Sequence, residues 1–119
     1  MKKLYNQKSK DLLVKKLESE DFNRTTCSFY KYVTIIDPLI FRDKIYEEFD
    51  NIDILGRVYI AEEGINAQIS VPDKNWGLFL KLISNIKLLQ GADIKTAIND
   101  GISFYKLVVK VKKEIVAYN

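Results

Sequence analysis

The segment from Ile65 to Val71 restricts the fold most strongly, because apolar and polar residues alternate through it without a break. The apolar set is Ile65, Ala67, Ile69 and Val71, and the polar set is Asn66, Gln68 and Ser70. Successive side chains of a strand point to opposite faces, so the pattern predicts a half-buried strand. We therefore expect a sheet with one face on a core and the other face open.

Three further segments are rich in aromatic and β-branched residues, which predicts strands over Ser28–Ile36, Ile54–Ala61 and Phe104–Ile115. The segment Asp93–Ile98 is a candidate for a short additional strand. Helices are expected where apolar residues recur every three or four positions. These segments are Ser9–Glu20, Pro38 to about Asp50 with Asp37 as its N-cap, and Lys74 to about Leu88 with Trp76, Phe79, Leu80 and Ile83 inside.

The order of strand, helix, strand, strand, helix and strand predicts an α+β fold of the ferredoxin-like (acylphosphatase-like) split βαββαβ type. In that fold a four-stranded antiparallel sheet carries both helices on one face, and here an N-terminal helix is added. The strands from Ser28 and Ile65 are expected at the centre, and those from Ile54 and Phe104 outside them. We expect residues 1–27 to form an arm with a short helix and residues 28–119 to form the domain.

Composition agrees with one globular domain, since the chain has 119 residues, of which 47% are hydrophobic and 29% charged. No apolar run approaches the ~20 residues of a membrane span, and the basic start lacks the apolar stretch of a secretory signal. The single cysteine, Cys27, cannot form an internal disulfide and indicates a reducing compartment. We therefore expect a cytoplasmic protein without a membrane partner.

The chain contains no histidine, which excludes His-based acid–base catalysis and imidazole metal ligands. Cys27 has no histidine to activate it and is interpreted as a small structural residue. No glycine-rich dinucleotide loop is present. We expect no cofactor, no metal site and no catalytic residue in this chain.

The sheet face that the two helices leave uncovered, here called the open face, is predicted from the same alternation. Its candidate binding residues are Tyr30, Tyr32, Arg57, Tyr59, Asn66, Gln68, Lys106, Lys110 and Lys112. Aromatic rings on a sheet can stack bases, lysine and arginine neutralise phosphates, and amides read base edges. The net charge is +3, with +3 at each end of the chain and −3 in the middle, and this modest asymmetry is compatible with a polyanionic partner. Cover of this face by protein explains the same residues, because tyrosine is common at protein interfaces.

Several segments together resemble a known family, the N-terminal domain of the bacterial rhodanese-containing tRNA uridine hydroxylases. The most specific is the run Glu63-Gly64-Ile65-Asn66-Ala67-Gln68-Ile69-Ser70-Val71-Pro72. Shorter matching segments are Arg24-Thr25-Thr26, Ser28-Phe29-Tyr30-Lys31-Tyr32, Asp37-Pro38 with Arg42-Asp43, Gly56-Arg57-Val58-Tyr59, Ser103-Phe104, and Val109-Lys110-Val111 through Ile115-Val116-Ala117.

The resemblance implies a domain that precedes a rhodanese domain in an enzyme making 5-hydroxyuridine at the tRNA wobble position in an oxygen-dependent reaction. The cysteine tied to activity belongs to the rhodanese loop, so Cys27 inherits no role. The family continues beyond the position of Asn119, which suggests an excised or truncated domain without activity of its own. The expected partners are tRNA and the rhodanese domain.

Two other functions are weighed against tRNA binding. Acylphosphatase chemistry needs a phosphate-cradling loop after the first strand, but Asp37 would repel phosphate there and Pro38 lacks an N–H donor. A docking or dimerisation module without RNA contact stays open, and it predicts that the tyrosines of the open face are buried in the full-length protein.

Overall fold

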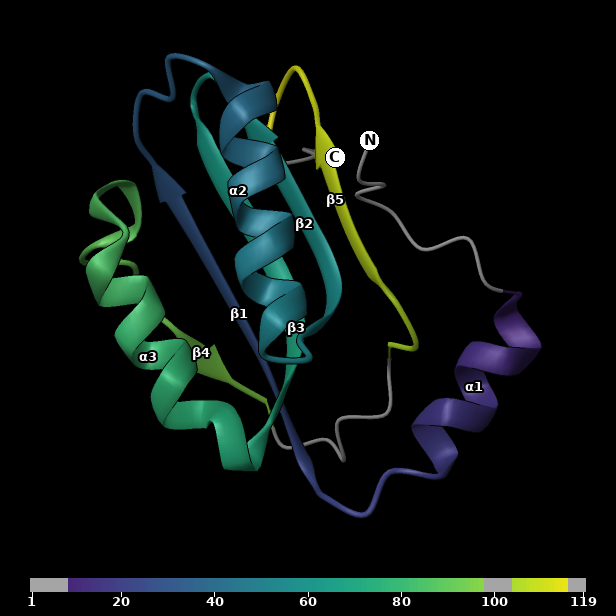
Figure 1. Cartoon of the computed structure of the whole chain (residues 1–119). Coiled ribbons are helices and arrows are strands. Elements are labelled where there is room, and N and C mark those ends of the chain that lie inside the picture. The colour runs from purple at the N-terminus through teal and green to yellow at the C-terminus, as the bar shows by residue number, and fades with distance from the viewer. Residues whose placement is uncertain (1–8, 98–103, 116–119) are drawn as a thin grey trace.

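The computed structural model describes residues 9–97 and 104–115, which form a mixed sheet with two helices on one face (Figure 1). The five strands are β1 (Arg24–Tyr32), β2 (Leu55–Ala61), β3 (Gly64–Pro72), β4 (Lys95–Thr96) and β5 (Leu107–Val111). The helices are α1 (Lys10–Glu18), α2 (Pro38–Asn51) and α3 (Trp76–Asn85), and the 3₁₀ turns are η1 (Asp73–Asn75) and η2 (Lys87–Leu89). The predicted α+β ferredoxin-like class is confirmed.

The sheet differs from the expected four antiparallel strands in number and direction. Its order is β4-β1-β3-β2-β5, and β5 pairs in parallel with β2. The two-residue strand β4 takes the place beside β1, within the segment that was a candidate for a short additional strand. The final strand is therefore displaced to the opposite edge, and β2 lies inside the sheet rather than at its border.

Strand and helix boundaries follow local chemistry closely in the first part of the chain. Ser9 caps α1 by accepting from the Leu12 N–H at 3.3 Å, and Asp37 caps α2 by accepting from the Ile40 N–H at 3.2 Å. Pro38 occupies the first turn of α2, where its missing N–H costs nothing. The first strand begins earlier than predicted, at Arg24, because it pairs with β3 along its whole length.

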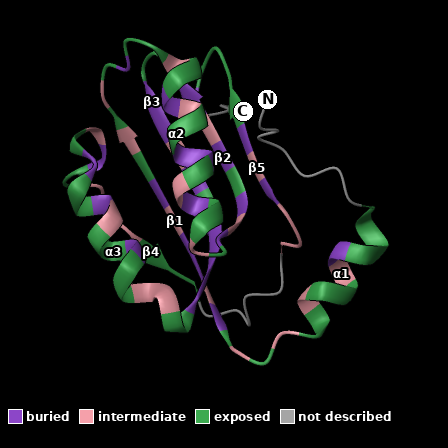
Figure 2. Ribbon diagram, in the orientation of Figure 1, coloured by how far each residue is buried: buried purple, intermediate pink, exposed green. Residues whose placement is uncertain are grey.

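The core lies between the sheet and helices α2 and α3, as the buried purple bands of Figure 2 show. Phe41, Ile45 and Phe49 of α2 are buried as their four-residue spacing predicts. In α3, Phe79 and Ile83 are buried, but Leu80 is 43% exposed, which contradicts its expected inward position. A helix of ten residues between two 3₁₀ turns presents one narrow stripe to the sheet, and Leu80 falls beside it.

The ends of β1 and β3 lie very close together at Gly64, and the neighbouring Lys31 places its charge outside the core. Gly64 has φ +152, and a Cβ there would lie 2.1 Å from the Lys31 carbonyl oxygen of β1, so the pairing of β1 with β3 at this point requires glycine. Lys31 has the same alternation parity as the buried Phe29, and its Nζ donates to the Gln90 carbonyl. Its ammonium group thus avoids the core.

Arg24 joins the N-terminal arm to the sheet. Its Nε and Nη2 each donate to a carboxylate oxygen of Glu20 at 2.7 Å. Its Nη1 donates to the carbonyl oxygens of Asp53 at 2.9 Å and Ser70 at 3.1 Å. Since Arg24 is only 7% exposed, the arm is fixed by a buried and well-satisfied ion pair.

Candidate nucleic-acid interface

The open face forms on the side of the sheet opposite α2 and α3. Phe29 of β1 is buried on the helix side and Ile35, which follows the strand, is buried as well. Tyr30 and Tyr32 of β1 are 59% and 51% exposed. The two tyrosine rings meet edge to face with centroids 6.0 Å apart. Tyr30 and Tyr32 are thus exposed, as their outward position in the predicted strand requires.

Strand register brings most of the predicted residues together in two rows across the sheet. One row runs from Tyr30 through Asn66 and Tyr59 to Lys110. The next row runs from Ser28 through Gln68 and Arg57 to Val108. Neighbouring strands lie about 4.8 Å apart, so each row is a continuous line of outward side chains.

The positive charge of the open face gathers along β5 and the residues that flank it. Lys110 and Lys112 are exposed and Lys106 is half-buried. Their positions alternate with Leu107 and Val109, which are buried against the core as predicted. Val111 has the same alternation parity as Leu107 and Val109 but is 39% exposed, so burial against the core does not extend to the end of this edge strand.

The chain after β5 folds back over part of the open face, which the sequence did not predict. Ile115 is only 2% exposed although it does not belong to the main core. Asn66 donates from Nδ2 to the Ile115 carbonyl at 2.8 Å, and the Ile115 N–H donates to Glu63 Oε2 at 3.2 Å. The ammonium of Lys112 lies 4.9 Å from the centre of the Tyr59 ring. Asn66 and Tyr59 therefore contact the chain's own C-terminal segment and are less accessible than Tyr30 and Tyr32.

Two hollows flank Arg57 on the open face. A smaller one of about 100 Å³ is lined by Arg57, Tyr59, Asn66 and Gln68. A larger one of about 310 Å³ lies on the other side and includes Arg57, Phe104 and Lys106 in its lining. The Arg57 guanidinium carbon lies 5.5 Å from the centre of the Phe104 ring, and Nη2 donates to Gln68 Oε1 at 3.2 Å. Phe104 was not among the predicted site residues, although it has the same alternation parity as Lys106 and Lys110.

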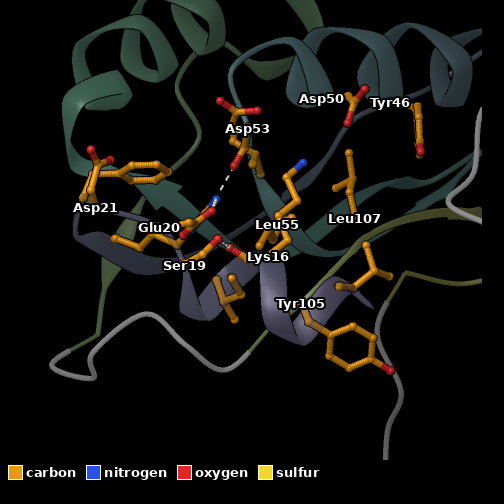
Figure 3. Close-up of a pocket in the computed structure, with 15 residues that line it drawn as sticks. Lys16, Ser19, Glu20, Asp21, Tyr46, Asp50, Asp53, Leu55, Tyr105 and Leu107 are labelled. Carbon is orange, nitrogen blue, oxygen red and sulfur yellow. Dashed lines mark hydrogen bonds and ion pairs between the residues drawn. The ribbon is translucent and has the colours of Figure 1, made fainter. Parts of the chain in front are cut away.

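A third cleft, of about 330 Å³, lies between α1 and the sheet (Figure 3). Its lining includes the four carboxylates of Glu20, Asp21, Asp50 and Asp53, against the cations of Lys16 and Arg24. The Arg24 guanidinium is already bonded to Glu20 and to two carbonyl groups. An excess of negative charge makes this cleft unsuited to a nucleic-acid backbone, and the open face is the better candidate.

An acylphosphatase would bind phosphate at the connection from β1 to α2. Here two backbone N–H groups of this connection already donate to carbonyl groups of the chain. The N–H groups of Val33 and Ile35 donate to the carbonyls of Glu63 and Glu62 at 2.9 and 3.0 Å. The Asp37 carboxylate caps α2 and places negative charge at the helix start. These contacts oppose anion binding at this connection.

Cys27 lies on β1 with 1% exposure and faces the core. Burial raises the pKa of its thiol from the ordinary value of 9.0 to about 12. A thiol in this environment stays protonated at neutral pH and is a poor nucleophile. Its environment agrees with the predicted structural role.

Most of the chain matches a known protein family. Residues 24–115 match the family described as the UPF0176 acylphosphatase-like domain. The chain belongs to this family.

Curated relatives named tRNA uridine(34) hydroxylase match nearly the whole chain. One from Leptospira interrogans is 44% identical over 115 residues, covering 96% of this chain and 31% of the relative. One from Citrobacter koseri is 45% identical over 116 residues, covering 96% of this chain and 33% of the relative. The chain thus spans about a third of the length of the relatives it matches.

Solved structures of low sequence identity share the fold alone. The BLUF protein BlrB in its dark state aligns with a TM-score of 0.54 at 14% identity, over 75% of this chain and 74% of that chain. Full-length HypF in its phosphate- and nucleotide-bound form aligns with a TM-score of 0.55 at 12% identity, over 82% of this chain and 14% of HypF.

None of the helices in the described parts of this chain has the length and apolar character needed to cross a membrane.

Proposed function

We propose that this chain is the N-terminal domain of a tRNA uridine(34) hydroxylase and that it helps to hold the tRNA. In this proposal residues 1–27 are an arm, residues 28–119 are the ferredoxin-like domain, and a rhodanese domain follows in the complete enzyme. The relatives' shared name gives the reaction as hydroxylation of uridine 34 of tRNA. The family resemblance of the sequence implies in addition that this is the wobble position and that the reaction depends on oxygen. The domain contributes binding, and the reacting groups belong to the rest of the enzyme.

The observation that carries the binding role is the meeting of exposed tyrosines and a basic strand on one sheet face. Tyr30 and Tyr32 present their rings at the β1 side, and Lys110 stands at the β5 end of the row that Tyr30 begins. Phosphates of the tRNA backbone would pair with Arg57, Lys106, Lys110 and Lys112. Unstacked bases would contact Tyr30 and Tyr32, because every base offers a flat face for stacking.

The second candidate function is docking of the rhodanese domain or of a second copy on the same face. The C-terminal segment favours it, since Ile115 is bound to the open face by Asn66 and Glu63. The last described residue of the chain thus lies beside Asn66, on the face where such a domain would dock. In this case the tyrosines are covered by protein and the isolated chain does not bind tRNA.

A binding titration with tRNA at several salt concentrations separates the two functions. The variant Lys106→Glu/Lys110→Glu/Lys112→Glu is expected to bind at least about tenfold more weakly than the unaltered chain at low salt. Each lost phosphate contact lowers the slope of log affinity against log salt by about 0.7–0.9, so three lost contacts lower it by about 2.

The matched control reverses the charge of three other lysines in the variant Lys15→Glu/Lys16→Glu/Lys81→Glu. These residues are exposed on α1 and α3, are not among the candidate residues of the open face, and carry the same total change of charge. Equal loss in both variants would indicate a general charge effect and contradict the proposed site. Unchanged affinity and slope in the β5 variant would reject tRNA binding by this face.

A further inference from the structure

The larger hollow on the open face combines features that a nucleotide site needs. It has a volume of about 310 Å³ and is lined by Gly56, Arg57, Phe104, Tyr105, Lys106 and Val108. Two cationic side chains and two aromatic rings thus surround one concave space. The lining of the smaller hollow beside it includes one cation, Arg57, and one aromatic ring, Tyr59.

The two cations of the hollow are placed by strand pairing. Arg57 pairs with Val108, and Lys106 stands two residues before Val108 on the same face. Strand spacing and rise put the Cβ atoms of Arg57 and Lys106 about 8 Å apart. Two long side chains at that separation can contact the same phosphate group.

The Arg57 guanidinium keeps most of its hydrogen-bonding capacity. Within residues 9–97 and 104–115, its one hydrogen bond goes to Gln68, and no carboxylate lies at ion-pair distance. Arginine has five N–H donors, so several are free to bind an anion. An exposed arginine with a neutral partner is also less costly to redirect toward a ligand than one in an ion pair.

Phe104 gives the hollow a flat apolar wall. Its ring holds the Arg57 guanidinium at 5.5 Å, and both side chains contact the same cavity. Nucleobases stack on aromatic rings and also on the planes of arginine guanidinium groups. In a duplex each base lies between its neighbours, and its faces are not free to stack on protein.

We propose that this hollow binds one unpaired nucleotide of the tRNA, with its phosphate between Arg57 and Lys106 and its base against the Arg57–Phe104 pair. This inference rests on the proposed function and adds to it a preference for unpaired RNA. The β5 lysines attract any RNA backbone, whereas this hollow favours RNA with an unstacked base. The domain therefore distinguishes a loop from a stem.

The test measures binding of two fluorescent RNAs to the whole chain by anisotropy, one a short unpaired strand and the other a blunt duplex. Phe104→Leu is expected to weaken binding of the unpaired strand about fivefold or more, since stacking of one base contributes about 1–3 kcal/mol. Binding of the duplex is expected to change by less than about twofold. Arg57→Lys keeps the charge but removes the planar group, so it should give the same selective loss without a change in salt slope.

The control variant is Phe22→Leu, which changes another half-buried phenylalanine that contacts cations. The ring of Phe22 lies 4.0 Å from the Lys74 ammonium and 5.5 Å from the Arg24 guanidinium, near the acidic cleft. It should bind both RNAs as the unaltered chain does. Unfolding midpoints of all variants show that each variant is folded at the temperature of the titration.

Three results would overturn the inference. If Phe104→Leu and Arg57→Lys weaken both RNAs equally, or neither, the hollow does not select unpaired nucleotides. If the variant Lys106→Glu/Lys110→Glu/Lys112→Glu still binds tRNA more weakly in that case, the proposed function stands. Only the nucleotide site in the hollow is then rejected. If the unaltered chain binds neither RNA nor tRNA, both proposals fail and a protein partner is favoured for the open face.

Discussion

Replacement of Arg24 by methionine tests how the N-terminal arm is held to the sheet. The change removes two 2.7 Å contacts to Glu20 and the two bonds to the Asp53 and Ser70 carbonyls. Loss of one partner of a buried ion pair costs about 3–5 kcal/mol. Glu20 has a side-chain exposure of 14% and can regain some water, so the lower limit of about 3 kcal/mol is expected.

Urea unfolding followed by Trp76 fluorescence measures this effect, because Trp76 is the single tryptophan and packs against the core. With a urea slope of about 1–3 kcal/mol/M, the midpoint should fall by roughly 1 M or more without a change in slope. The control is Arg57→Met, an exposed arginine, whose stability should change by less than about 0.5 kcal/mol. A loss below about 1 kcal/mol in Arg24→Met would refute the reasoning, because the pair would then be too hydrated to hold the arm.

Three further changes have defined outcomes. Gly64→Ala should destabilise the domain by more than about 2 kcal/mol in urea unfolding, since a Cβ would lie 2.1 Å from the Lys31 carbonyl oxygen; wild-type stability would contradict the close pairing of β1 with β3. The raised pKa of Cys27, about 12 against 9.0 unfolded, stabilises the folded chain below pH 9 and loses this contribution as pH rises toward 12. Cys27→Ala should therefore show a shallower loss of stability above pH 9, and an identical pH profile would contradict the burial effect. Asn66→Ala should speed hydrogen exchange of the Ile115 amide, and unchanged exchange would show that Glu63 alone holds the C-terminal segment.

Alternation in the sequence predicted the buried face of each central strand correctly except at Ser70, a member of the polar set that is fully buried in the structure. The pattern from Ile65 to Val71 and the pair Tyr30 and Tyr32 are local signals, because a strand has a period of two. The caps Ser9 and Asp37 are local in the same way, since each bonds an N–H three residues away. Such features depend only on residues that are close in the sequence, so the sequence is enough to predict them.

Strand order was harder to predict because it depends on distant segments. The final strand could pair at either edge of the sheet, and the two residues of β4 decide the matter by occupying the edge beside β1. The contact between Asn66 and Ile115 joins residues 49 positions apart. An apolar Ile115 after Lys112-Lys113-Glu114 was the one local sign that the chain turns back onto the protein.

The position of bound tRNA is tested most directly by nuclear magnetic resonance of the tyrosine rings in the labelled chain. Tyr30 and Tyr32 lie on the open face, whereas Tyr46 is buried on α2 at the opposite side of the sheet. Addition of tRNA should move the ring signals of Tyr30 and Tyr32 and leave that of Tyr46 in place. Bound tRNA with unmoved Tyr30 and Tyr32 signals, or with a shift confined to Tyr46, would place the RNA elsewhere and contradict binding by the open face.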